Sequence, residues 1–241
     1  MKSMYVIAYS AVFFAFYFVP SLATIIHVPD DYPTIQEAIY ASSDFDTVLV
    51  QPGRYFELLN FNGRNIVVGS LFITTGYKDY IWQTTIDGDY SGTVVTFENG
   101  EDEYTVLSGF SIVYGSKGGI ICRNSSNLQL VDNYIGRNWN LEKEGGGIHI
   151  YNSDPLIANT RFSRNYSITS GGGLYALEAD IIVRNCIFEE NEGFWGGGAF
   201  FYKWTPMIRN CQFIENEADD SAGKYFRGCS VVMDSVLIEK N

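Results

Sequence analysis

Aromatic side chains recur at a fixed place in the second half of the chain. The segments "GGGIHIY", "GGGLYAL" and "GGGAFFY" begin at residues 145, 171 and 196. If each segment is a strand, its mostly aliphatic alternate positions face a core and the other positions face outward. The outward set holds His149, Tyr151, Tyr175, Phe200, Tyr202 and Tyr225. Aromatic rings can stack on the apolar faces of sugars while tyrosine hydroxyls hydrogen-bond them. We therefore predict a glycan-binding strip, which Trp195 and Trp204 border from loops.

A second interpretation of the same register is purely structural. Aromatic residues at equivalent positions of neighbouring strands stabilise a sheet by stacking on one another. A loop or a partner domain could also cover them. The residue pattern alone leaves both interpretations open.

The segments that must position these side chains form a repeat. The last glycine of each cluster recurs at intervals of 28, 26, 25 and 25 residues, at Gly119, Gly147, Gly173, Gly198 and Gly223. Eighteen residues after the last four of these comes an asparagine, at Asn165, Asn191, Asn216 and Asn241. Three residues before the first three of those asparagines stands Phe162, Phe188 or Phe213. We interpret the glycines, asparagines and phenylalanines as architectural.

A period near 25 residues is too short for a pair of helices but fits one turn of a β-solenoid. Each turn, or rung, is expected to hold about three short strands, with equivalent residues stacked above one another. The glycines would allow positive φ and close backbone approach at a corner. The asparagines would tolerate left-handed corners and hydrogen-bond from rung to rung. The sequence therefore predicts an all-β solenoid of about eight rungs.

The segment over about residues 32–42, "YPTIQEAIYAS", has a helical pattern instead. Thr34 is the expected N-cap, with Glu37 three residues later, and Ile35, Ala38 and Ile39 form an apolar face. A solenoid needs a cap over its terminal rung. The regular repeats, over about 117–241, run to Asn241 without a second cap. We therefore expect a C-terminally truncated chain, further C-terminal domains, or end-to-end self-association.

Composition and the first residues restrict the cell compartment and the partners. Residues 1–23 have a basic residue at Lys2, an apolar run and a small-residue cleavage site, which together predict a signal peptide. The protein is therefore expected to be secreted or on the cell surface, with residues 24–241 as its folded domain. The net charge of −12 excludes a nucleic-acid partner.

Two further patterns have structural interpretations. The segment 87–98, "DGDYSGTVVTFE", matches the spacing of a calcium-binding loop, but its flanks are not helical, so we interpret it as a turn and a strand. Cys186 and Cys211 occupy one repeat position, where stacked strands lie about 4.8 Å apart. We expect two packed thiols rather than a disulfide. No metal or other cofactor is predicted, and a calcium ion at the segment 87–98 is the alternative.

From about Ile26 to Asn241 the chain resembles the right-handed parallel β-helix proteins of the pectin-lyase-like superfamily. The segment "VPDDYPTIQEAI" and the later "DTVLVQPGRYFE" resemble the N-terminal cap and first rung of that group. The "GGGI", "GGGL" and "GGGA" clusters, with "FSRN", "FEEN" and "FIEN", are also similar to repeats of chlamydial polymorphic membrane proteins. The resemblance implies a right-handed parallel β-helix, and the second similarity implies a surface adhesin.

Enzymes of that superfamily mostly cleave or de-esterify acidic polysaccharides. "GRYFE" matches a motif of pectin methylesterases, but their catalytic Gln and Asp motifs do not follow it. The two histidines, His27 and His149, do not lie in the Gly-His-Gly of polygalacturonase-like enzymes. We therefore predict recognition of a polysaccharide or cell-surface glycan without catalysis. A structural or adhesive stalk, and a lyase or hydrolase with a non-standard site, are the alternatives.

Overall fold

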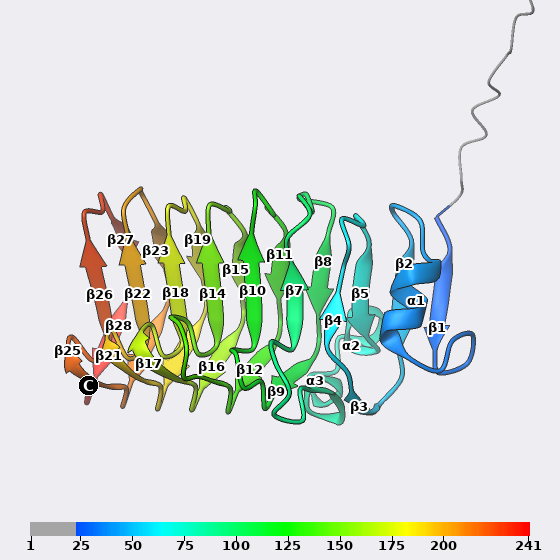
Figure 1. Cartoon of the computed structure of the whole chain (residues 1–241), viewed down its shortest axis with the longest axis horizontal. Coiled ribbons are helices and arrows are strands. Elements are labelled where there is room, and N and C mark those ends of the chain that lie inside the picture. Colours follow the sequence, from blue (N-terminus) through cyan, green and yellow to red (C-terminus); the bar gives the residue numbers. More distant parts are fainter. Residues whose placement is uncertain (1–22) are drawn as a thin grey trace, which may run out of the picture.

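Residues 23–241 are described by the computed structural model, and they wind into a stack of parallel strands (Figure 1). The predicted signal peptide, 1–23, lies outside the described residues except for Ala23. Each strand pairs in parallel with its equivalent in a neighbouring rung, on both sides except at the ends of a sheet, so four sheets run along the stack. Within residues 23–241, every helix is too short or too polar to cross a bilayer.

Each sheet takes one strand from successive rungs. The nine-stranded sheet holds β1 Ile25–Val28, β2 Thr47–Val50, β5 Val67–Ser70, β8 Val106–Ser108, β11 Gln129–Val131, β15 Leu156–Ala158, β19 Ile182–Arg184, β23 Met207–Arg209 and β27 Val232–Asp234. The eight-stranded sheet holds β3 Gly53–Phe56, β6 Thr84–Asp87, β9 Ser111–Val113, β12 Tyr134–Gly136, β16 Arg161–Ser163, β20 Ile187–Glu189, β24 Gln212–Ile214 and β28 Leu237–Glu239.

Two shorter sheets complete the rungs. The seven-stranded sheet holds β4 Leu59–Asn60, β7 Val95–Phe97, β10 Ile120–Arg123, β14 Ile148–Tyr151, β18 Leu174–Leu177, β22 Ala199–Tyr202 and β26 Lys224–Arg227. The four-stranded sheet holds β13 Trp139–Asn140, β17 Tyr166–Ser170, β21 Glu192–Trp195 and β25 Glu217–Asp220. The predicted fold class is confirmed, with two corrections: there are about nine turns rather than eight, and the later rungs have a fourth strand.

The predicted N-terminal helix is α1, Ile35–Ala41, slightly shorter than expected. Thr34 is its N-cap and accepts a hydrogen bond from the Glu37 amide at 3.1 Å, while Ile35, Ala38 and Ile39 are buried. The Glu57 carboxylate accepts from the amides of Ile35 and Gln36, at 3.0 and 2.9 Å. In this chain, the glutamate of "GRYFE" therefore anchors the first turn of the helix.

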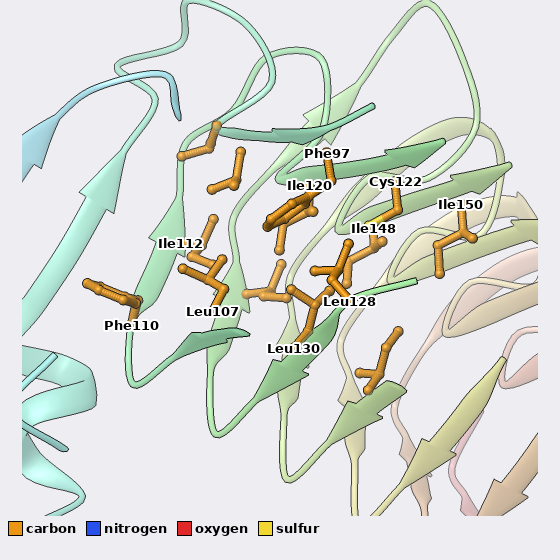
Figure 2. Close-up of a cluster of buried hydrophobic side chains, with 14 of the residues drawn as sticks. Phe97, Leu107, Phe110, Ile112, Ile120, Cys122, Leu128, Leu130, Ile148 and Ile150 are labelled. Atoms are coloured by element: carbon orange, nitrogen blue, oxygen red, sulfur yellow. The ribbon is translucent and has the colours of Figure 1, made fainter. Parts of the chain in front are cut away.

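Apolar side chains at equivalent positions fill the interior along the stack. Figure 2 shows Ile120 and Ile148 among these side chains. They are register partners on β10 and β14, and both are buried. Phe162, Phe188 and Phe213 stack with their rings 4.5 and 4.7 Å apart and nearly parallel. The core is thus a set of columns, each of which needs the same register in every rung.

The repeated asparagines form a buried hydrogen-bonded ladder between the eight-stranded and four-stranded sheets. The Asn165 side-chain amide donates to the Oδ1 atom of Asn191 at 3.0 Å, and Asn191 donates in the same way to Asn216 at 2.9 Å. The left-handed residues at this corner are not these asparagines but those just before them, among them Arg164 and Glu190, with φ of 57° and 51°. The prediction of inter-rung hydrogen bonds is confirmed, and that of left-handed asparagines is wrong at these positions.

Two different glycines of each cluster are needed for different reasons. The first, such as Gly171, has a φ of 65°, which favours glycine. The third has no such angle, but a Cβ on Gly147, Gly173 or Gly198 would collide with the carbonyl oxygen of the matching glycine in the next rung. The glycine corner therefore packs backbone directly on backbone.

Cys186 and Cys211 are buried free thiols, as predicted. Each donates to the carbonyl oxygen two residues earlier, at 3.2 Å. They pack at one repeat position inside the stack and form no covalent link.

Replacement of Asn191 by Ala tests the ladder. The side chain of Asn191 accepts from both nitrogens of Asn165 and donates to Asn216 and to the Phe162 carbonyl. Its loss leaves buried polar groups without partners, and we expect a fall of about 3 kcal/mol in the free energy of unfolding. Urea denaturation measures this. The exposed strand residue Gln212, replaced by Ala, should change stability by less than about 0.5 kcal/mol. Equal effects of the two substitutions would contradict the role of the ladder.

Candidate functional site

The outward aromatic residues form a stacked column on the seven-stranded sheet. His149, Tyr175, Phe200 and Tyr225 are register partners on β14, β18, β22 and β26. The rings of Tyr175 and Phe200 are stacked at 5.4 Å, and those of Phe200 and Tyr225 at 5.1 Å. His149 meets Tyr175 at 5.1 Å in a tilted arrangement. The predicted register of the column is present.

Burial of the two middle rings changes what this column can do. Tyr175 and Phe200 are only 6% and 5% exposed. Neighbouring rings of the column occupy both of their faces, so only ring edges remain for a ligand. A sugar cannot stack flat on either residue. Any stacking platform must come from other side chains.

A groove of about 490 Å³ lies over this column and supplies such side chains. Its lining comprises Glu144, Ser170, Tyr175, Trp195, Phe200, Tyr202, Tyr225 and Arg227. Trp195 is 41% exposed and ends β21, so the prediction that it lies in a loop is wrong. Tyr202 ends β22 and is half-buried. The groove therefore has a floor of ring edges, with an exposed indole and a phenol in its lining.

Charged groups of both signs line the groove. The Arg227 guanidinium lies 5.4 Å from the centre of the Tyr202 ring, and the Lys203 ammonium lies 5.3 Å from it. Lys203 also pairs with Glu178 at 2.7 Å, whereas Arg227 has no carboxylate partner within residues 23–241. Glu144 supplies the negative group of the lining. Arg227 and Glu144 can thus orient a polar ligand.

Burial keeps two rings of the column, those of Tyr175 and His149, in their neutral forms. It raises the pKa of Tyr175 to about 12, with smaller contributions from the charges of Glu144 and Tyr202. It lowers the pKa of His149, whose Nδ1 atom lies 3.0 Å from the Glu144 carbonyl oxygen. Near neutral pH the column therefore offers a neutral phenol hydroxyl and a neutral imidazole.

Three predicted site residues, His149, Tyr151 and Trp204, lie outside the groove lining. Tyr151 is exposed one rung before Leu177 and two before Tyr202. Trp204 is 55% exposed and lies in the turn after β22. Sequence reasoning missed Arg227 and also Glu144 and Ser170. Glu144, Ser170 and Trp195 share one repeat position, immediately before a glycine cluster, and this shared position is the signal that could have identified the first two.

The calcium-like segment 87–98 forms a turn and the strand β7, as interpreted from the sequence. Its first carboxylate, Asp87, is buried and pairs with Arg54. Asp87 also accepts from the Asp89 amide at 2.8 Å. Within residues 23–241, no group of three His, Cys, Asp or Glu side chains is placed to hold a metal ion.

A family model described as "Right handed beta helix region" matches residues 61–241. This covers most of the stack, from the end of β4 through β28. No curated protein matches the chain.

The raised pKa of Tyr175 gives a prediction about stability at high pH. An unfolded tyrosine loses its proton near a pKa of about 10. The folded state holds that proton up to about 12, so stability is unaffected below about pH 10 and falls as pH rises through about 12. A Tyr175→Phe variant has no such proton, and its stability should fall less over this range. Urea midpoints at several pH values measure the difference. Tyr77→Phe, at an exposed position, is the control, and equal slopes for Tyr175→Phe and the parent would contradict the prediction.

Proposed function

The chain belongs to the right-handed β-helix family, and we propose that it uses the outer face of one solenoid sheet to recognise a glycan without cleaving it. The observation that carries this proposal is the groove over the aromatic column, whose lining includes the exposed indole of Trp195 and the ring of Tyr202. Its volume of about 490 Å³ falls within the range of roughly 300–1,000 Å³ that is usual for small-ligand sites.

The groove combines the two kinds of contact that a sugar needs. Trp195 supplies exposed aromatic surface for the apolar face of a sugar ring, and the Tyr202 ring, which Arg227 and Lys203 cover, contributes its edge and hydroxyl. The Tyr175 hydroxyl, the Glu144 carboxylate and the Arg227 guanidinium supply hydrogen-bonding groups at the floor and edges. Because the underlying rings are locked in a stack, little side-chain entropy is lost when a ligand binds their edges.

The protein would meet this glycan outside the cytoplasm, because residues 1–23 are predicted to be a signal peptide.

A stiff surface spacer is a second candidate function. The observation that favours it is the unbroken axial run of asparagine hydrogen bonds and phenylalanine stacks, which rigidifies the solenoid. The two functions are separated by whether any polysaccharide binds.

Affinity electrophoresis through gels that contain neutral or acidic polysaccharides tests the proposal. We expect the protein to be retarded by at least one polymer. Trp195→Ala and Tyr202→Ala should each weaken binding about tenfold or more, as the loss of a buried aromatic contact does in other interfaces. Trp204→Ala is the matched control, because Trp204 is exposed but does not line the groove.

Three other outcomes would contradict the proposal. If no polymer retards the protein, glycan recognition is wrong and the spacer is favoured. If Trp204→Ala weakens binding as much as Trp195→Ala, the groove is not the site. An increase in reducing ends during incubation with the bound polymer would show that the protein is an enzyme.

A further inference from the structure

One rung carries an insertion at the corner between the nine-stranded and eight-stranded sheets. Two residues make this corner between β8 and β9, and again between β11 and β12. Between β5 and β6 the corner instead holds α2, Phe72–Thr75, and α3, Asp79–Gln83. Figure 1 shows α3 beside β9, and the Ser111 hydroxyl donates to the Ile81 carbonyl at 2.8 Å. The insertion thereby holds Trp82 over the eight-stranded sheet.

Trp82 borders a recess on this sheet, away from the glycan groove. Its ring lies 4.7 Å from that of Tyr134 and is 53% exposed. The recess measures about 220 Å³ and is also lined by Tyr114 and by the guanidinium-bearing Arg54 and Arg137. Across residues 23–241, no carboxylate lines it. In a chain of net charge −12, this is an unusual concentration of positive charge and aromatic surface.

Both guanidinium groups are held in place by the same phenol. Arg54 pairs with the buried Asp87, and its Cζ atom lies 5.4 Å from the Phe56 ring centre and 5.5 Å from that of Tyr114. Arg137 donates to the Tyr114 hydroxyl at 3.1 Å. Asp87 offsets the charge of Arg54, but Arg137 pairs with no carboxylate in the described part of the chain. The recess therefore keeps one uncompensated positive charge on a fixed support.

We propose that this recess binds a carboxylate carried on a six-membered ring. The ring lies against the exposed face of Trp82, and its carboxylate accepts hydrogen bonds from Arg137 and from the free edge of Arg54. A volume of about 220 Å³ is below that of drug-sized sites, so the occupant is a single ring rather than a chain. The ring can belong to a sugar acid or to an aromatic acid, which share this chemistry.

Isothermal titration of the purified protein with glucuronate and with 4-hydroxybenzoate tests the proposal, with glucose and phenol as the uncharged counterparts. We expect at least one acid to bind and its counterpart to bind about tenfold more weakly or not at all. Binding of glucuronate alone identifies a sugar-acid site, and binding of 4-hydroxybenzoate alone identifies an aromatic-acid site. Both results support the proposal.

Two arginines make a matched pair of variants. Arg137 and Arg164 occupy the same corner position in successive rungs, with φ of 56° and 57°, but Arg164 pairs with Glu190 and does not line the recess. Arg137→Gln should weaken binding of the acid about tenfold or more, and Arg164→Gln should leave it unchanged. Trp195→Ala should also leave it unchanged, which separates this site from the glycan groove. The proposal is overturned if neither acid binds, if the uncharged counterparts bind equally, or if Arg137→Gln has no effect.

Discussion

Direct packing of backbone on backbone at the glycine corner is the constraint on which the structure depends. A side chain on Gly173 would occupy the position of the Gly198 carbonyl oxygen, so each rung must lie at full strand-to-strand contact with the next. This fixes the register in which the asparagine ladder and the phenylalanine column form. The asparagine ladder at one corner and the phenylalanine column in the interior therefore both follow from the same rung-to-rung spacing. The interior is specified by repetition rather than by a unique set of contacts.

The same register limits which aromatic ring faces on the outer surface a ligand can reach. Tyr175, Phe200 and Tyr225 stack on one another as the core phenylalanines do, so their ring faces are used for the fold. The surface available to a ligand must come from residues outside the column, such as Trp195 at the end of β21. At the other candidate site, it comes from the insertion that carries Trp82. In both places, residues outside the stacked column supply the exposed aromatic side chains.

The repeat made most of the fold predictable. The regular spacing of Phe162, Phe188 and Phe213 in the sequence corresponds to rings that stack in successive rungs. The N-cap at Thr34 was predictable because it depends only on local sequence. The fourth strand, and with it the position of Trp195, could not be predicted, because β17, β21 and β25 share no apolar alternation. The burial of Tyr175 could not be predicted either, since it depends on side chains from neighbouring rungs and not on its own strand. The anchoring of α1 by Glu57 joins residues 21 and 22 positions apart, which local patterns do not connect.

The central claim is that a register-locked column supports a ligand groove on the seven-stranded sheet. A crystal structure of the protein with a fragment of a bound polysaccharide tests it most directly. The account predicts a sugar ring flat against Trp195, above a Tyr175–Phe200–Tyr225 stack whose rings remain parallel. A sugar bound on another sheet, or one that separates the stacked rings, would contradict it.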